Sequence, residues 1–328
     1  MMRPLLIRRH ALAGFLSPLL LSLPAQAADW PERTIRMIVP FVAGAGADTV
    51  GRTFAEELAK ALGQPVVVDN KGGAGGLIGT AEGARAPADG YTLLLTSQGT
   101  TVFNMGLYKA PGYDPLKDLT PVAVTGFLPN VLVISPNNPA KTVAELVAQA
   151  RAKPGELNYG SSGIGSSLHL SGVLAEQRTG VKLQHVPYRA APAAVLAVIN
   201  GEVSMGFFNA PTVVGQIKAG KLKALAVTSK DRATQLPDMP TMMEAGMADF
   251  VVETWLGFAV PAGTPGAIVT RLNAEINRIG QIPEVKEKLL IQGFEVLPPT
   301  SPEAARKLIV DDQAIWLPII RQSGAKAE

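Results

Sequence analysis

The sequence contains no cysteine and only three histidines. The absence of cysteine excludes disulfides and thiolate sites. The H-E-x-x-H pattern of zinc proteases is also missing, as is the phosphate-binding pattern G-x-x-x-x-G-K-[ST]. Three G-x-G pairs, beginning at Gly44, Gly73 and Gly163, lack the third glycine of a dinucleotide-binding loop. These absences argue against thiol, zinc-protease and nucleotide chemistry, and we expect neither a metal ion nor a cofactor.

The first 27 residues are typical of a secretory signal peptide. Arg3, Arg8 and Arg9 precede an apolar run over residues 11–23, and Ala25-Gln26-Ala27 fits the A-x-A cleavage pattern. This run is too short to span a bilayer, and no later stretch is long and apolar enough. We therefore expect cleavage after Ala27 and a periplasmic protein. The pair Arg8-Arg9 leaves twin-arginine export open beside ordinary secretion.

The charge balance changes once the leader is removed. The leader carries three arginines and no acid, so the remaining 301 residues hold 27 basic and 27 acidic side chains. The whole-chain pI of about 9.0 therefore gives no support for nucleic-acid binding. The remaining length is sufficient for two packed domains. A chain of this size without cysteine fits the bacterial periplasm.

The stretch TIRMIVPFVAGAGADTVGRTFAEELAKAL, residues 34–62, predicts a strand, a small-residue loop and a helix. The alternation of Ile35, Met37 and Val39 indicates a buried strand. The loop over residues 42–47 is nearly all Gly and Ala, which lets backbone N–H groups point into a cavity. Asp48 is expected to cap the helix. This arrangement favours an anion site, although it also fits a βα turn without a ligand.

Strands alternate with helical stretches along the rest of the chain, which predicts an α/β fold with mostly parallel sheets. Ligands bind beyond the carboxyl ends of such strands, where Phe41, Asn70 and Ser97 are expected. Apolar runs at 122–135, interrupted at Pro129-Asn130, and at 255–260 predict two crossings between domains. The predicted division is a signal peptide over 1–27, a first domain over 28–129 plus 255–328, and a second domain over 130–254. The crossings form a natural hinge, where we expect Trp255 to pack and consider it for a cleft wall.

A second small-residue loop, SSGIGS at 161–166, opens a helix in the second domain. Two helix N-termini that face one cleft can neutralise a carboxylate without a basic side chain. We expect His169, in the first turns of this helix, to hold the loop by a hydrogen bond. A serine hydrolase that uses Ser161 or Ser162 with His169 remains an alternative, although the G-x-S-x-G pattern is absent.

The segments IVPFVAGAGAD, VVVDNKGGAGGLIGT, YGSSGIGSSLHL, HVPYR and WLGFAVPAGTP occur in this order. Together they resemble the Bug solute receptors, the periplasmic binding proteins of the tripartite tricarboxylate transporter type. The resemblance covers nearly the whole chain. It implies a two-domain Venus flytrap fold, type II-like, and capture of a small carboxylated solute by two loops, partly through bound water. The loops map to Phe41–Asp48 and Ser161–His169.

Pattern and resemblance together predict a set of ligand-binding residues and no catalytic residue. The predicted ligand-binding residues are Phe41, Ala43, Gly44, Ala45, Asp48, Asn70, Ser97, Ser161, Gly165, Ser166, His169 and Asn209. The loop Ala43-Gly44-Ala45-Gly46 departs from the family, which usually has proline and paired glycines there. Ala190 stands where the family usually has glycine. The solute therefore does not carry over from any relative.

The sequence thus predicts a non-enzymatic, monomeric solute receptor for a small organic carboxylate. Closure about the hinge would present the loaded receptor to membrane transporter subunits. In an alternative, the receptor binds the same carboxylate but signals to a membrane sensor kinase instead of a transporter. The hydrolase described above is the third possibility. No nucleic-acid partner is expected.

Overall fold

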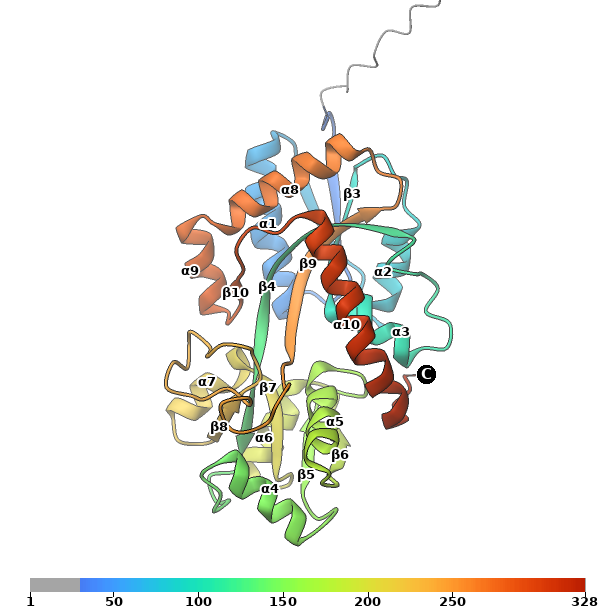
Figure 1. Cartoon of the computed structure of the whole chain (residues 1–328). Coiled ribbons are helices and arrows are strands. Elements are labelled where there is room, and N and C mark those ends of the chain that lie inside the picture. The colour runs from blue at the N-terminus through green and yellow to red at the C-terminus, as the bar shows by residue number, and fades with distance from the viewer. Residues whose placement is uncertain (1–29, 328) are drawn as a thin grey trace, which may run out of the picture. The chain divides into compact units, whose positions relative to one another are not determined.

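A computed structural model describes residues 30–327; the predicted signal peptide lies outside these residues. All the helices and strands belong to one folded unit that begins at Pro31. This unit has two lobes joined by two long strands (Figure 1). No helix in residues 30–327 combines the length and hydropathy needed to cross a membrane.

The first lobe is built from the two ends of the described chain. Its N-terminal elements are β1 (Ile35–Val39), α1 (Gly46–Leu62), β2 (Val66–Asn70), the 3₁₀ turn η1 (Ala74–Gly76), α2 (Leu77–Ala84), β3 (Thr92–Ser97), the π-helical turn η2 (Gly99–Phe103) and α3 (Asn104–Leu107). Its C-terminal elements are α8 (Gly266–Gly280), α9 (Pro283–Ile291), β10 (Glu295–Val296) and α10 (Pro302–Ser323). The strands β2, β1 and β3 are parallel neighbours in that order.

The second lobe comes from the middle of the chain. Its elements are α4 (Val143–Ala152), β5 (Asn158–Ser161), α5 (Ser167–Thr179), β6 (Gln184–Pro187), α6 (Ala191–Asn200), β7 (Met205–Asn209), α7 (Ala210–Lys218) and β8 (Lys223–Val227). The strands β6, β5 and β7 are parallel neighbours. Both lobes therefore have the parallel βα arrangement that the sequence predicts.

The joining strands are β4 (Leu119–Ile134) and β9 (Glu253–Pro261), and both are antiparallel to their neighbours. β4 pairs with β9 as far as Pro129, and from Asn130 onward it pairs with β7. The apolar run interrupted at Pro129-Asn130 is thus one continuous strand that changes partner at this dipeptide. Proline fits here because it lacks an N–H to donate, while the Asn130 N–H donates to Thr228 Oγ1 at 3.1 Å.

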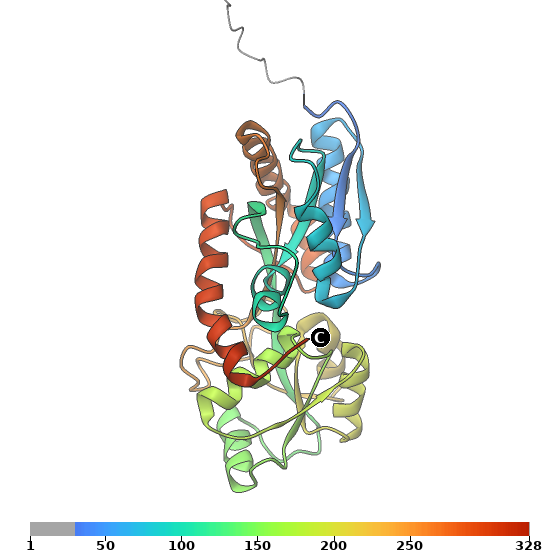
Figure 2. The ribbon, with the colours of Figure 1, turned by 90° about the vertical axis from the view of Figure 1, so that its right-hand side faces the viewer.

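Local sequence explains how α4 and α10 begin and which face α1 buries. In α1, Val50, Phe54, Leu58 and Leu62 are all buried, as their spacing predicts. Thr142 caps α4 by accepting the Glu145 N–H, and Ser301 caps α10 with Pro302 in its first turn. α10 runs along both lobes (Figures 1 and 2), and Gln322 near its end accepts a hydrogen bond from Gln177 of α5 at 3.2 Å.

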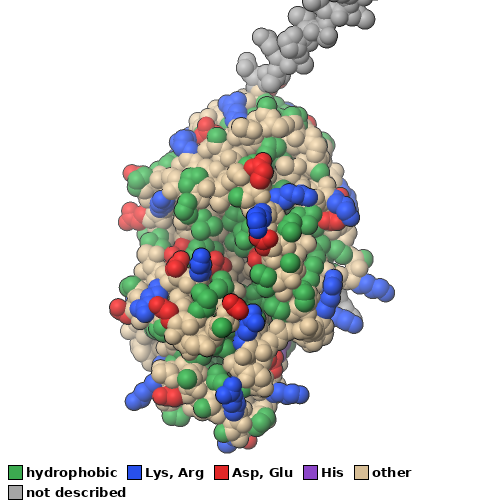
Figure 3. Space-filling view, viewed as in Figure 1, with side chains coloured by type: hydrophobic (Ala, Val, Ile, Leu, Met, Phe, Trp, Pro, Cys, Tyr) green, Lys and Arg blue, Asp and Glu red, His purple; other side chains and the backbone are tan. Residues whose placement is uncertain are grey.

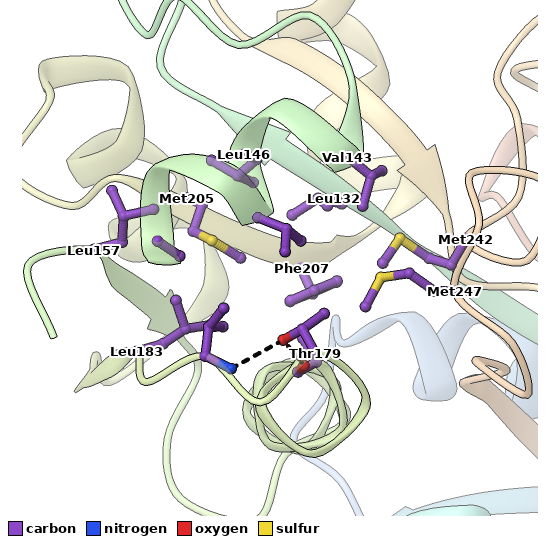
Figure 4. A pocket seen from close by; sticks show the side chains of 14 residues that line it. Leu132, Val143, Leu146, Leu157, Thr179, Leu183, Met205, Phe207, Met242 and Met247 are labelled. Carbon is purple, nitrogen blue, oxygen red and sulfur yellow. Dashed lines mark hydrogen bonds between the residues drawn. The ribbon is translucent and has the colours of Figure 1, made fainter. Parts of the chain in front are cut away.

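The core of the second lobe contains a small apolar cavity of about 30 Å³ beneath α4 (Figure 4). Leu146, Met205, Phe207 and Met247 are among the side chains around it. Its walls are almost entirely apolar, and a buried water needs several polar partners, so the cavity does not suit a water molecule. It is therefore a gap in the apolar packing beside α4.

Candidate functional site

A cleft of about 650 Å³ opens between the two lobes. The loop after β1 and the start of α1 supply one wall, through Phe41 and residues 44–47. The loop after β5 and the start of α5 supply the facing wall, through Ser162 and residues 164–168. Because the first N–H groups of a helix have no intrahelical partner, both walls present hydrogen-bond donors and positive dipole ends.

Asp48 supports the first loop from behind and does not cap α1. The N-cap position is Ala45, which has no side-chain acceptor, and Asp48 is the third helical residue. Asp48 Oδ2 accepts the Gly44 N–H at 2.8 Å and Arg52 Nε at 3.0 Å. Burial raises the pKa of this carboxyl, but hydrogen bonds from Gly44, Asn70 and Arg52 outweigh it and hold the pKa below its ordinary value. The prediction of an Asp48 cap is wrong because the side chain turns back to Gly44.

Asn70 belongs to the same supporting network. Its Nδ2 donates to Asp48 Oδ1 at 2.8 Å and to the Phe41 carbonyl at 3.1 Å. Its Oδ1 accepts Arg52 Nη2 at 2.8 Å. With both ends of its amide engaged, Asn70 fixes the loop and does not line the cleft.

Two histidines support the second loop in a similar way. The Gly165 N–H donates to His169 Nδ1 at 3.1 Å, and Ser161 Oγ lies 2.7 Å from His185 Nε2. The two imidazole rings stack with centroids 4.1 Å apart. Burial lowers the pKa of His169 to about 4, with a smaller contribution from His185, and burial lowers the pKa of His185 to about 4. Both rings are therefore neutral near pH 7, as an accepting Nδ1 requires.

The hydrolase alternative finds no nucleophile here. Ser161 is fully buried and pairs with His185, not with the expected His169. Neither Ser161 nor His169 lines the cleft. Ser162 does line it, but no hydrogen bond joins its hydroxyl to a histidine of the described residues. The serine–histidine pair that the structure does form, Ser161 with His185, lies behind the second loop and does not line the cleft.

Seven of the predicted site residues line the cleft, and five lie outside its lining. The lining residues are Phe41, Gly44, Ala45, Ser97, Gly165, Ser166 and Asn209. Ala43, Asp48, Asn70, Ser161 and His169 do not line it, and the last four hold the two loops. Trp255 does not form a wall of the cleft. Its indole N–H donates instead to Asp312 of α10 at 2.7 Å.

Several cleft residues were not predicted. Beyond the predicted Asn209, a third helix N-terminus brings Pro211 and Thr212 of α7 to the cleft. Asn104 and Tyr108 come from α3 and the segment after it, where no pattern in the sequence indicates a site. Thr254 Oγ1 is buried and has no hydrogen-bond partner within residues 30–327. A strand-end signal could have found Thr254, because it lies at the start of the crossing strand β9.

The cleft is uncharged, and its lining combines apolar side chains with polar groups. None of the described residues that line it is an Asp, Glu, Lys, Arg or His. Its polar groups are hydroxyls, side-chain amides and backbone N–H groups. No group of three or more His, Asp or Glu side chains within residues 30–327 could hold a metal ion. The cleft therefore suits an anion held by dipoles and hydrogen bonds rather than by a counter-charge.

Comparison with known proteins identifies the family. The profile described as "Tripartite tricarboxylate transporter family receptor" matches residues 50–325. The chain belongs to this family. It is 39% identical to Protein BugT of Bordetella pertussis over 304 residues, which are 92% of this chain and 93% of BugT.

Two solved structures show the same fold over nearly their whole length. The R. palustris protein Rpa4515 with adipate has a TM-score of 0.80 and 34% identity, covering 91% of this chain and 99% of that protein. The periplasmic binding protein BugD has a TM-score of 0.76 and 35% identity, covering 91% of this chain and 100% of BugD. The chain is a solute-binding receptor of α/β periplasmic-binding-protein fold, not an enzyme, and the periplasm is the compartment of its family.

Proposed function

We propose that this receptor captures a small organic carboxylate in the cleft and delivers it to the membrane subunits of a tripartite transporter. The observation that carries the proposal is the pair of glycine loops that open α1 and α5 onto one uncharged cleft. Adipate in the R. palustris relative, a dicarboxylate, supports the same ligand class. The proposal takes the protein as a monomer after cleavage at Ala27, with a sensor kinase as the alternative partner.

We propose that the ligand contacts the seven lining residues named above and that the remaining predicted residues set the loop geometry. We also propose the domain division predicted from the sequence, because β4 changes its partner strand between Pro129 and Asn130. The domains are then 28–129 plus 255–328 and 130–254. Closure about this junction would enclose the ligand.

The first experiment identifies the ligand class. Thermal-shift measurements on refolded, ligand-stripped protein would compare monocarboxylates, dicarboxylates and tricarboxylates with uncharged amides of the same size. A carboxylate at 100 times its Kd should stabilise the fold by about 2.7 kcal/mol. A panel in which the amides stabilise as well as the carboxylates would contradict an anion site.

The second experiment tests the backbone cradle at Gly44. This glycine has φ +81°, and valine disfavours positive φ, so Gly44→Val should distort the loop and abolish measurable binding of the best carboxylate. Gly63→Val is the matched control, because Gly63 has φ +68° at the far end of the same helix with equally open space around it. Calorimetry should show normal affinity for Gly63→Val. Equal affinities in the two variants would count against the cradle.

A third variant tests whether a side-chain cation, rather than the backbone cradle, binds the carboxylate. Arg189 is exposed near the second lobe's loops and does not line the cleft. Arg189→Ala should therefore leave the affinity close to that of the unmodified protein. Loss of binding in this variant would show that a side-chain cation is the main partner of the carboxylate.

A further inference from the structure

Part of the cleft wall comes from the segment that follows α10. We call residues 324–327 the α10 extension. The chain turns at Gly324, which has φ +69° and ends the helix, and the Ser323 hydroxyl accepts the Ala325 N–H at 3.2 Å. Figure 2 shows the extension running from the end of α10 to the middle of the molecule. The turn therefore directs the chain away from the helix and brings it to the cleft, which Ala327 lines.

The first lobe holds the extension in place. The Ala327 N–H donates to the carbonyl of Leu107, the last residue of α3, at 3.1 Å. The last carbonyls of a helix have no intrahelical partner, so this bond satisfies an acceptor that the short helix leaves open. Leu107 is buried and lines the cleft, and its side chain occupies the space that a Cβ on Gly165 would need. The extension is thus attached to a residue that contacts the second loop.

The small side chain of Ala327 leaves space in the cleft. Ala327 is half-buried and packs against the buried apolar cluster that contains Leu107, Leu174 and Ile320. Protein interiors are close-packed, so the cluster does not admit additional atoms. A larger side chain at this position would therefore extend toward the cleft. The neighbouring Lys326 is exposed and does not line the cleft.

Charge gives this wall no means of telling one carboxylate length from another. None of the described residues that line the cleft is charged. Basic and acidic side chains are scattered over the face that carries α10 and do not gather into one patch (Figure 3). Linear dicarboxylates that differ only in length carry the same charge and the same polar groups. The walls therefore have to distinguish them by shape.

We propose that Ala327 is a specificity-determining residue, which sets the length of carboxylate that the cleft accepts. This inference rests on the proposed function, because it takes the cleft as the place where the carboxylate binds. An alanine at this wall admits a longer ligand than a larger side chain would. The hydrogen bond to the Leu107 carbonyl fixes the position of the wall, so the size of the side chain at 327 sets the limit.

The test is a calorimetric titration with two series of ligands, the linear dicarboxylates from succinate to suberate and the linear monocarboxylates from butanoate to octanoate. The unmodified protein is compared with Ala327→Val and Ala327→Leu. Because overpacking costs more for a ligand that fills the space, the affinity for the longest bound member should fall about tenfold relative to the shortest in Ala327→Leu. Ala327→Val should give a smaller change in the same direction. Thermal unfolding without ligand shows that each variant is folded.

The control for the new side chain is Lys326→Leu. It adds the same leucine at the exposed neighbouring position, so the ratio of affinities between long and short ligands should stay as in the unmodified protein. The ratio is the decisive quantity, since a general disturbance of the fold would weaken all ligands alike. An equal loss of affinity for every length, or an unchanged ratio in both Ala327 variants, would overturn the inference.

A failure of the proposed function gives a different result. If the unmodified protein binds neither series but the thermal-shift panel detects another carboxylate, the role of Ala327 in selecting length is wrong and the proposed function stands. If the panel also detects no carboxylate, both proposals are wrong.

Discussion

At the scale of single residues, Asn130 connects neighbouring elements at the point where β4 changes its partner strand from β9 to β7. It is fully buried. Its Nδ2 donates to Ser171 Oγ at 3.2 Å, and its Oδ1 accepts Asn209 Nδ2 at 2.7 Å. Asn209 itself lines the cleft and opens α7. Asn130 thus connects β4 to α5 through Ser171 and to the end of β7 through Asn209, a candidate ligand contact.

Asn130→Ala should destabilise the protein by about 1–3 kcal/mol, because it removes the partner of the buried Ser171 hydroxyl and of the half-buried Asn209 amide. Urea unfolding would measure the loss. Asn200→Ala is the control, since Asn200 is exposed at the end of α6, and a change within about 0.5 kcal/mol is expected there. Similar small costs for both variants would show that Ser171 and Asn209 find other partners.

His169 and His185 give the stability a pH dependence. Burial lowers both pKa values from 6.5 to about 4, so the unfolded chain takes up protons first as the pH falls. The histidine contribution is therefore complete above pH 6.5 and is lost as the pH falls towards 4. Glu253 and Asp312, whose pKa values are raised, act in the opposite direction.

The comparison of the unmodified protein with His185→Gln isolates the histidine effect. The glutamine can still form a hydrogen bond with Ser161 but does not titrate. Urea midpoints measured from pH 7 to pH 4 should fall less steeply in the variant. Parallel curves would mean that His185 is not held neutral by the fold.

At the scale of the elements, the two site loops were predictable and much of the remaining wall was not. The glycines and small residues before α1 and α5 act locally, through backbone conformation, so their pattern is visible in the sequence. Asn104 and Tyr108 reach the cleft only because α3 packs beside α10, which is a long-range arrangement. Successive side chains of β9 point to opposite faces, so Trp255 and its neighbours lie on different sides of the strand. The sequence does not show which of these faces meets the cleft.

The apolar cavity below α4 allows a test of how the second lobe is packed. Leu146 is buried beside this cavity, and Leu146→Ala should enlarge it and cost about 2–5 kcal/mol. Leu196→Ala on α6 is the matched control, because Leu196 is 56% exposed and should change stability by about 0.5 kcal/mol or less. Equal effects on the urea midpoint would contradict the cavity's place in the core. Carboxylate affinity should be unchanged in both variants, since neither side chain lines the cleft.

At the scale of the whole folded unit, the lobes are joined by β4 and β9, by α10 against α5, and by side-chain contacts from α9 and β10. Gln235 Nε2 donates to the Leu290 carbonyl at 2.7 Å, and Thr234 donates to Glu295. Leu107 lies where a Cβ on Gly165 would be, so the first lobe touches the second at a glycine of the site. One buried apolar cluster also spans both lobes, with Phe103 and Trp316 from the first and Leu174 from the second, so closure about the proposed hinge has to occur within this shared packing.

Small-angle scattering should therefore show a smaller radius of gyration when the best carboxylate saturates the protein. Gly44→Val, which is expected not to bind, supplies the control and should show no change on addition of the same carboxylate. A scattering profile of the unmodified protein that is the same with and without ligand would contradict closure.

The alternation of side chains on β9 has a thermodynamic consequence. Thr254 and Leu256 line the cleft, whereas Glu253 and Trp255 line a groove on the opposite face of β9, so a rotation that narrows the cleft would widen that groove. Molecules bound on the two sides would then oppose each other, and by reciprocity each would reduce the affinity of the other by the same factor.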